Sequence, residues 1–260
     1  MNALRPPHPR AATLAVWWRN LKVWRRLLGP ALAMNFGEPV LYLLGLGYGL
    51  GVFIQGMGGM PYLTFLASGI VASSAMTTAS FEGMYSVFTR MVPQRTYEAI
   101  LATPAEVDDI VAGEILWCAT KSLVSAAAVL LVAVALGALE PRPGLLAVPA
   151  VVLLTGLAFA GPALVISALA PNYDFFNYYM VLVLTPLMIL SGVFYPVETL
   201  PAAVRALVDF LPLVHAVDLA RGLATDQPLD APLRHVTVLG TYALVGAYLA
   251  TVLFRRRLIR

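Results

Sequence analysis

Charged residues are scarce in this chain. Asp, Glu, Lys and Arg make up 12% of its 260 residues, whereas apolar residues make up 60%. A soluble domain of this size usually has about 25% charged and about 45–50% apolar residues. Because a folded soluble protein needs polar cover over much of its surface, the composition excludes a soluble enzyme and a disordered chain.

Cysteine, histidine and lysine are also rare. The one cysteine, Cys118, lies in an apolar run, which excludes a disulfide framework. His8, His215 and His235 have no His or Cys partner at ligand spacing, so we expect no metal site. His215 and Asp218 share a helix face, where an interfacial hydrogen bond is favoured over acid–base chemistry. We expect no catalytic residue, and without a Gly-Lys-Ser/Thr phosphate loop the chain cannot hydrolyse ATP alone.

Long uncharged runs dominate what is present. A bilayer-crossing helix needs about 20 mainly apolar residues. The runs are apolar on all faces, unlike the alternating strands of about 10 residues in membrane barrels. The sequence therefore predicts an all-α, polytopic membrane protein whose six-helix transmembrane domain occupies residues 30–260. The six transmembrane helices are expected near 31–53, 62–88, 112–137, 146–169, 177–196 and 235–254.

Basic residues predict the orientation of these helices. With six spans, both termini lie on one side, and that side then holds twelve basic residues against four on the other. Because basic residues favour the cytoplasmic side, we expect the N and C termini to be cytoplasmic. The four on the other side are Arg142, Arg205, Arg221 and Arg234.

The N-terminal segment 1–29 predicts an amphipathic interface helix over residues 12–28. One face is aromatic and another is basic, which suits the headgroup level and anionic lipid. An ordinary membrane anchor is one interpretation, and a gate or docking helix is the other. The density of tryptophan favours the second. The residues concerned are Trp17, Trp18, Arg19, Lys22, Trp24 and Arg26.

The segment 94–104 predicts a short helix on a cytoplasmic loop. The helix is expected to stop before Pro104, because proline disfavours helix in the preceding residue. A short amphipathic helix of this kind fits a groove on a partner protein, although a solvated turn is the alternative. The candidate docking residues are Arg95, Thr96, Tyr97, Glu98 and Leu101.

The segment 198–222 is unusually apolar for an exposed connection. Apolar pieces of about 10–14 residues are too short to span a bilayer and suit re-entrant or interfacial helices. We therefore expect two short outer re-entrant helices here.

Three ionisable residues fall within predicted spans, near the inner leaflet. Our hypothesis is that Lys121 pairs with Glu82 or Glu38 and closes the inner end of the bundle as a gate. The alternative is that Lys121 extends alone to the headgroups.

Aromatic residues cluster at the ends of the predicted spans. Most are expected to form interfacial belts, and a minority could stack on sugar rings along a transport pathway. The candidates for substrate lining are Tyr173, Phe175, Phe176, Phe194 and Tyr195.

Several runs, in this order, resemble the permease subunits of type-2 ABC exporters, and within them the NodJ-type permeases. The resemblance covers nearly the whole chain. It rests on the six spans, the basic tryptophan-rich N-terminal helix, Gln94-Arg95-Thr96-Tyr97-Glu98-Ala99-Ile100-Leu101, Ala170-Pro171-Asn172-Tyr173-Asp174-Phe175-Phe176, Ser191-Gly192-Val193-Phe194-Tyr195-Pro196 and Arg255-Arg256-Arg257-Leu258.

The resemblance implies a function and a set of partners. Such permeases act as homodimers in the bacterial inner membrane, driven by two separate ATPase subunits that hold ATP and Mg²⁺. The chain itself would need no cofactor and bind no nucleic acid. By the resemblance, 94–104 is the coupling helix, 12–28 the interface helix and 198–222 the outer re-entrant pair. NodJ-type permeases are associated with lipo-chitooligosaccharide export; related exporters move other polysaccharides, lipids or drugs.

Two rival classes stay open. A polytopic membrane glycosyltransferase or acyltransferase would need an acidic or histidine cluster at one membrane face, and the acidic residues here are dispersed or lie in the docking loop. A channel or secondary transporter often has inverted repeats, and the first and last three predicted spans show no convincing similarity.

Overall fold

The computed structural model describes residues 4–29, 37, 40–54 and 56–259. Within these ranges the secondary structure is helical, and β-type pairing is limited to one isolated bridge between Met57 and Met60. The predicted all-α class is therefore confirmed.

Four helices are long and apolar enough to cross a membrane. The first runs without a break through α4 (Tyr62–Phe81), the π-helical η2 (Glu82–Ser86) and α5 (Val87–Met91). The others are α7 (Val107–Ala135), α8 (Val148–Leu169) with the 3-10 turn η3 (Pro143–Leu146) before it, and α13 (Pro232–Leu258). At about 1.5 Å per residue, the shortest of them still reaches across a hydrocarbon core of about 30 Å.

Two shorter apolar helices accompany them, at Val40–Gly51 and Phe175–Leu190. The first contains η1 (Leu43–Tyr48) and α3 (Gly49–Gly51), and much of the predicted span 31–53 lies outside the described residues. The second consists of α9 (Phe175–Tyr179), η4 (Met180–Leu184) and α10 (Thr185–Leu190). It ends six residues before the predicted 196 because the chain turns at Gly192, whose φ is +75°.

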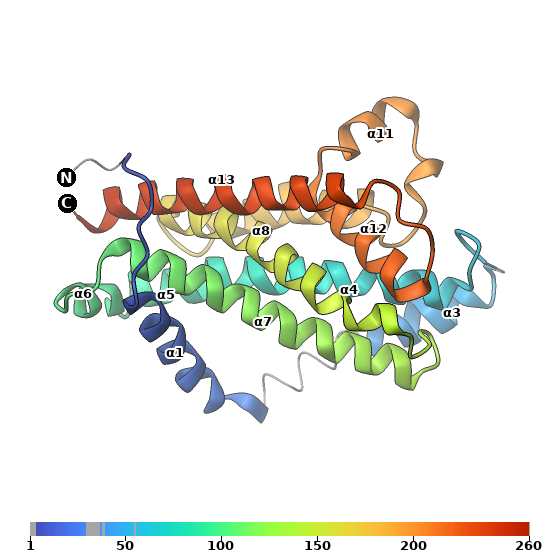
Figure 1. The fold of residues 1–260 in the computed structure, drawn as a ribbon, viewed down its shortest axis with the longest axis horizontal. Coiled ribbons are helices and arrows are strands. Elements are labelled where there is room, and N and C mark those ends of the chain that lie inside the picture. The colour runs from blue at the N-terminus through green and yellow to red at the C-terminus, as the bar shows by residue number, and fades with distance from the viewer. Residues whose placement is uncertain (1–3, 30–36, 38–39, 55, 260) are drawn as a thin grey trace.

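The remaining helices lie at the ends of the bundle. They are α1 (Ala12–Arg25), α6 (Thr96–Leu101), η5 (Val197–Thr199), α11 (Ala202–Val208) and α12 (Pro212–Thr225). Both chain ends lie beside α6 at one end of the long axis, and α3, α11 and α12 lie at the opposite end (Figure 1). We call these the α6 end and the α11 end.

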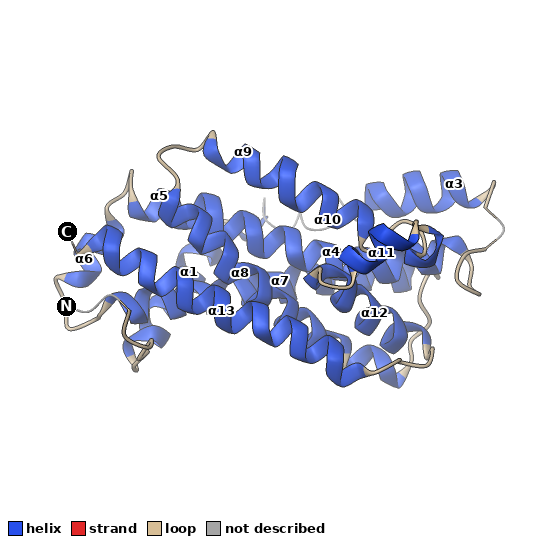
Figure 2. Cartoon of the chain, turned by 90° about the horizontal axis from the view of Figure 1, so that it is seen from above, coloured by secondary structure: helices blue, strands red, loops and turns tan. Residues whose placement is uncertain are grey.

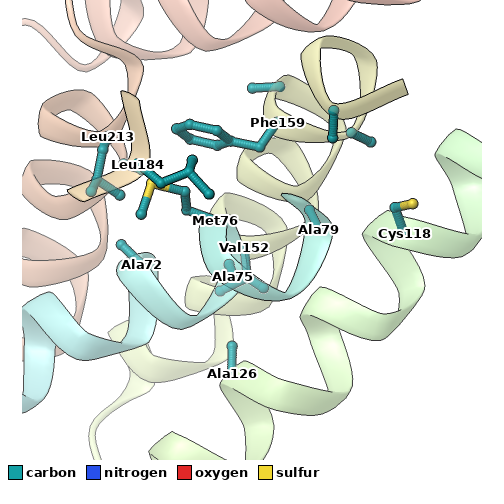
Figure 3. Close-up of a cluster of buried hydrophobic side chains, with 14 of the residues drawn as sticks. Ala72, Ala75, Met76, Ala79, Cys118, Ala126, Val152, Phe159, Leu184 and Leu213 are labelled. Carbon is teal, nitrogen blue, oxygen red and sulfur yellow. The ribbon is translucent and has the colours of Figure 1, made fainter. Parts of the chain in front are cut away.

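Helix α4 forms the centre of the bundle and packs against α7, α8 and α12. Its buried face is made of small side chains, including Ala72, Ala75 and Ala79, so neighbouring helices approach closely. Met76 of α4 and Phe159 of α8 fill the space between them (Figure 3). In contrast, α9 and α10 lie along one edge of the bundle (Figure 2).

Helices α8 and α13 cross with their backbones in contact. A Cβ added to Gly161 would lie 2.5 Å from the carbonyl carbon of Gly246, and one added to Gly246 would lie 2.6 Å from Cδ of Pro162. These distances are shorter than atoms tolerate, so the crossing requires glycine on both helices.

We expect Gly246→Leu to destabilise the protein by pushing α13 away from α8. Overpacking of a tight core costs about 1–3 kcal/mol, and here backbone atoms block relaxation. Gly240→Leu on the same helix is the matched control, because a Cβ added to Gly240 would have nothing within 4 Å. Thermal unfolding in detergent should show a lower Tm for Gly246→Leu alone; equal Tm values would contradict the close crossing.

Candidate functional site

Four charged side chains, the buried Glu82 and Glu114 and the half-buried Arg90 and Lys121, form a continuous ionic chain toward the α6 end. Lys121 Nζ lies 2.8 Å from Glu82 Oε2, and Arg90 Nη2 lies 2.9 Å from Glu82 Oε1. The same Arg90 atom lies 2.8 Å from Glu114 Oε2. The chain thus joins η2, α5 and α7, and its two positive and two negative charges balance, as burial requires. Glu38, the other predicted partner of Lys121, lies outside the described residues.

Neutral donors complete this ionic chain. Trp117 Nε1 donates to Glu82 Oε1 at 2.9 Å, and Asn20 Nδ2 of α1 donates to Glu114 Oε2 at 2.9 Å. The hydroxyl of Tyr97 donates to Glu114 Oε1 at 2.9 Å. Helices α1 and α6 are therefore attached to the ionic chain by one hydrogen bond each.

Tyr97 faces inward from α6. Its side chain is fully buried, with its ring centroid 6.3 Å from that of Phe254 on α13. Burial, followed by the negative charge of Glu114, raises the pKa of Tyr97 well above its ordinary value, so its hydroxyl stays a donor. Of the predicted docking residues, Tyr97 therefore anchors α6, while Thr96 and Leu101 are half-buried.

The opposite face of α6 is open. Arg95 and Glu98 are exposed, with 4.0 Å between Nε and Oε1, and Ala99 is exposed beside them. Arg95 has φ +48°, a left-handed conformation that turns the chain into the helix. An exposed ion pair at this distance adds little stability, so these charges are free to meet a partner.

Helix α1 packs its inner face on α7. Val16 sits where Gly113 leaves room, since a Cβ there would lie 2.7 Å from Val16 Cβ. Trp17 Nε1 donates to Thr120 at 3.0 Å, and the rings of Trp24 and Trp117 meet edge to face at 6.0 Å. The outer face carries exposed Trp18, Lys22 and Arg26, while Arg19 is half-buried.

A second buried ion pair fastens the N-terminal segment. Arg255 of α13 binds both carboxylate oxygens of Asp108, at 2.7 Å and 2.5 Å, and both side chains are 1% exposed. Arg255 also donates to the carbonyl of Arg5, and the backbone N–H of His8 donates to Asp108. The N-terminal segment, α7 and α13 are thus fastened together at the α6 end, a contact that sequence reasoning missed.

We expect Asp108→Asn to destabilise the protein strongly. Removing one partner of a buried ion pair costs about 3–5 kcal/mol, because the other charge stays buried. Asp174→Asn, at an exposed aspartate before α9, is the control and should behave as the parent. Tm of the two variants in detergent checks this; a parental Tm for Asp108→Asn would contradict the role given to the ion pair.

The candidate lining aromatics separate into two groups. Tyr173 and Phe176 belong to a cluster with Tyr85 and Phe88, in which the Phe88 and Tyr173 centroids are 5.0 Å apart. Phe175 is the first residue of the apolar helix formed by α9, η4 and α10. Phe194 and Tyr195 lie after the other end of that helix. The five predicted residues therefore do not share one surface; Tyr173 is partly exposed and Phe176 is buried.

Arg221 fastens α12 at the α11 end. It donates to Ser68 Oγ at 3.0 Å and to the carbonyls of Phe65 and Gly192 at 3.2 Å and 2.7 Å, and its guanidinium lies 3.7 Å from the Phe65 ring centroid. Sequence reasoning had counted Arg221 only as a basic residue. Within the part of the chain that the structure describes, no group of three metal-ligating side chains is found.

The four membrane-length helices define a membrane protein, and comparison gives its family. The chain belongs to the ABC-2 type transporter family, whose model matches residues 11–224. It is similar to nodulation protein J of Rhizobium leguminosarum bv. trifolii, with 45% identity over 247 residues, 95% of this chain and 94% of the relative.

Two further relatives differ in their sequence identity to this chain. Nodulation protein J of Rhizobium meliloti (strain 1021) is 43% identical over 246 residues, covering 95% of this chain and 94% of that protein. The inner membrane transport permease YadH of Escherichia coli (strain K12) is 26% identical over 200 residues, covering 76% and 75%. The resemblance predicted from the sequence is confirmed.

Proposed function

We propose that this chain is the permease subunit of an ATP-driven exporter that moves an amphiphilic, lipid-linked glycan across the bacterial inner membrane. Family membership supports a transport role. The observation that carries the proposal is that helix α6 has one exposed face and one buried face. Its open face offers a docking site, while its buried Tyr97 reaches the ionic chain inside the bundle. ATP and Mg²⁺ would be held by the docked partner.

The topology that we propose has six spans with cytoplasmic termini. The four long helices and the two shorter apolar helices supply six candidates. The positions of the chain ends and α6 at one end, opposite α11 and α12, agree with this (Figure 1). The sides then follow from the basic residues, which favour the cytoplasm at the α6 end. Residues 198–222 would cap the pathway on the outer side.

The proposed homodimer would use the edge formed by α9 and α10. Tyr178, Val181, Leu182 and Ile189 are exposed on this helix, and α9 and α10 contact the rest of the bundle only sparsely (Figure 2). Two copies facing along this edge would enclose a pathway between them. The partly exposed Tyr173 at its cytoplasmic end offers a ring face to a sugar.

The relatives and the membrane setting support the class of cargo that we propose. Two relatives named nodulation protein J are more than 40% identical over most of both chains, which supports a lipo-chitooligosaccharide as cargo. A lipid tail could stay in the bilayer while the glycan passes between permeases. Another polysaccharide or lipid on the same fold is the alternative, which the transport assay below separates.

The mechanism would transmit movement of α6 into the bundle. When the ATPase subunits close, α6 moves, and Tyr97 carries the displacement to Glu114 and Arg90. Because separating buried opposite charges is costly, α5 and α7 would move with α6 as a unit. Cargo moves outward only if the two conformations bind it with different affinity.

Cysteine labelling tests the proposed sides of the membrane. Cys118 is fully buried, so an introduced cysteine is the reactive one. Glu98→Cys on α6 and Leu207→Cys on α11 form a matched pair, both exposed and at opposite ends. In intact cells, a membrane-impermeant maleimide should label Leu207→Cys only.

Co-purification completes the test. Glu98→Cys should crosslink to a co-expressed ATP-binding subunit, and Leu207→Cys should not. Labelling of Glu98→Cys from outside, or a permease that never retains an ATP-binding subunit, would overturn the proposal.

A further inference from the structure

Two histidines from different helices meet at the α11 end. His215 of α12 and His235 of α13 have their Nδ1 atoms 2.8 Å apart, and their rings cross at 61° with centroids 4.9 Å apart. The His215 side chain is buried. The ring nitrogens of His215 therefore meet His235, twenty residues further on, and the carbonyl of Asp209, and not Asp218 as its helix spacing predicted.

The other ring nitrogens determine where the protons are. His215 Nε2 lies 2.9 Å from the carbonyl oxygen of Asp209, and His235 Nε2 lies 3.0 Å from that of Asp230. A carbonyl oxygen only accepts, so each Nε2 carries a proton. A neutral imidazole has one N–H. If both rings were neutral, both Nδ1 atoms would be unprotonated, and their lone pairs would face each other at contact distance.

We propose that His215 and His235 form a proton-binding site, in which one extra proton is shared between the two Nδ1 atoms and fastens α12 to α13. The pair then holds three ring protons and one positive charge. The separation of 2.8 Å fits an N–H···N hydrogen bond. A tetrahedral metal with bonds of about 2.0–2.1 Å would hold two nitrogens about 3.3 Å apart.

The surroundings balance the charge of the pair. Asp209 and Asp218 favour a cation there, whereas Arg234, which lies 3.5 Å from Asp209, disfavours a second one. Burial lowers the pKa of His215, which resists full protonation of both rings. The charges of Asp209 and Arg234 act on His215, and that of Asp218 acts on His235. Arg221 of α12 and Glu198 of η5 act on Asp218.

The site should hold α12 against α13 only at pH values between two titration steps of the pair. Raising the pH removes the shared proton, so stability gained by binding it is lost and the lone pairs repel. Lowering the pH adds a fourth ring proton, and two N–H groups then repel. The two steps belong to the pair and not to either ring. If the α11 end faces outward, as the proposed function requires, the attachment of α11 and α12 responds to external pH.

Nitrogen-15 histidine labelling of the full chain in lipid nanodiscs tests the site. The chain has 3 histidines, and the His8→Gln variant removes the exposed one and assigns its signals. Between the two titration steps we expect both pair Nε2 atoms protonated and one proton shared between the Nδ1 atoms. The signals of the pair should change in two steps as the pH is varied.

Hydrogen exchange over residues 209–235 provides the second measurement. Relative to the intrinsic exchange rate at each pH, the backbone should be about tenfold less protected on either side of the pH window than inside it. His235→Gln should remove this dependence, while His8→Gln should keep it. Titration of the pair in a single step, or pair signals that change on chelation of a retained metal, would overturn the proposal. Neither readout involves cargo or ATPase, so failure here is distinguishable from failure of the proposed function.

Discussion

Glu82→Gln is expected to cause a large loss of stability, about 3–5 kcal/mol of unfolding free energy, as for other buried pairs that lose one partner. Glu82 neutralises Lys121 and Arg90 together, and its side chain is 6% exposed. The substitution preserves the shape of the side chain but leaves a net positive charge inside the bundle. Thermal unfolding in detergent should show the loss, together with a lower yield of folded protein.

Restoring the charge balance should recover much of that loss. In the double variant Glu82→Gln with Lys121→Gln, one charge of each sign is absent, so the two effects should be strongly non-additive. Glu198→Gln, at an exposed glutamate of the α11 end, is the control. If Glu82→Gln unfolds like this control, or if the double variant is the sum of the single ones, the ionic chain is not a structural unit.

Ala99→Trp is expected to abolish coupling while leaving the fold intact. Ala99 is exposed on the open face of α6, so an indole there meets solvent in the free permease but blocks a docked partner. Loss of a well-packed interface contact costs about 1.4 kcal/mol or more, which is about tenfold or more in affinity for the ATP-binding subunit. Co-purification and ATP-dependent export per folded permease measure the effect.

Tyr97→Phe separates transmission from docking. It removes the hydroxyl that donates to Glu114 but leaves the open face of α6 unchanged. We therefore expect the ATP-binding subunit to be retained and export per ATP hydrolysed to fall. Leu146→Trp, at an exposed position remote from α6, is the control and should keep both partner binding and export per ATP hydrolysed at the parental level. Retained partner binding by Ala99→Trp would contradict the placement of the docking face.

Much of the fold is predictable because helices in lipid need long apolar runs. The runs at 62–88, 112–137, 146–169 and 235–254 all correspond to long helices, though each helix extends or ends a few residues away. Helix α7 begins at Val107 because Glu106 and Asp109 form a capping box there. The predicted span started at 112 because hydropathy marks only the apolar part of this helix, which follows its acidic first turn.

The partnership within the site is less predictable. The sequence suggested that Lys121 meets Glu82 or Glu38, and the structure brings it to Glu82. Arg90 and Glu114 were missed, although Glu82, Ser86 and Arg90 recur at four-residue spacing on one helix face. Tyr97 was assigned to docking because residue type does not reveal which face of a short helix turns inward.

Contacts between distant segments leave no local signal at all. Arg255 and Asp108, or His215 and His235, are brought together by the packing of separate helices. Single-sequence periodicity describes one helix at a time and does not give the rotation of one helix against another. The left-handed conformation of Arg95 also has no signal in the sequence, because it follows from how α5 and α6 are joined.

Transport by purified permease in proteoliposomes tests the central claim most directly. A labelled lipo-chitooligosaccharide should cross the bilayer when the permease is reconstituted with its ATP-binding subunit and Mg-ATP, and Ala99→Trp permease should not move it. A glycan without a lipid tail distinguishes the cargo class. Equal movement without nucleotide or without the ATP-binding subunit would contradict the account.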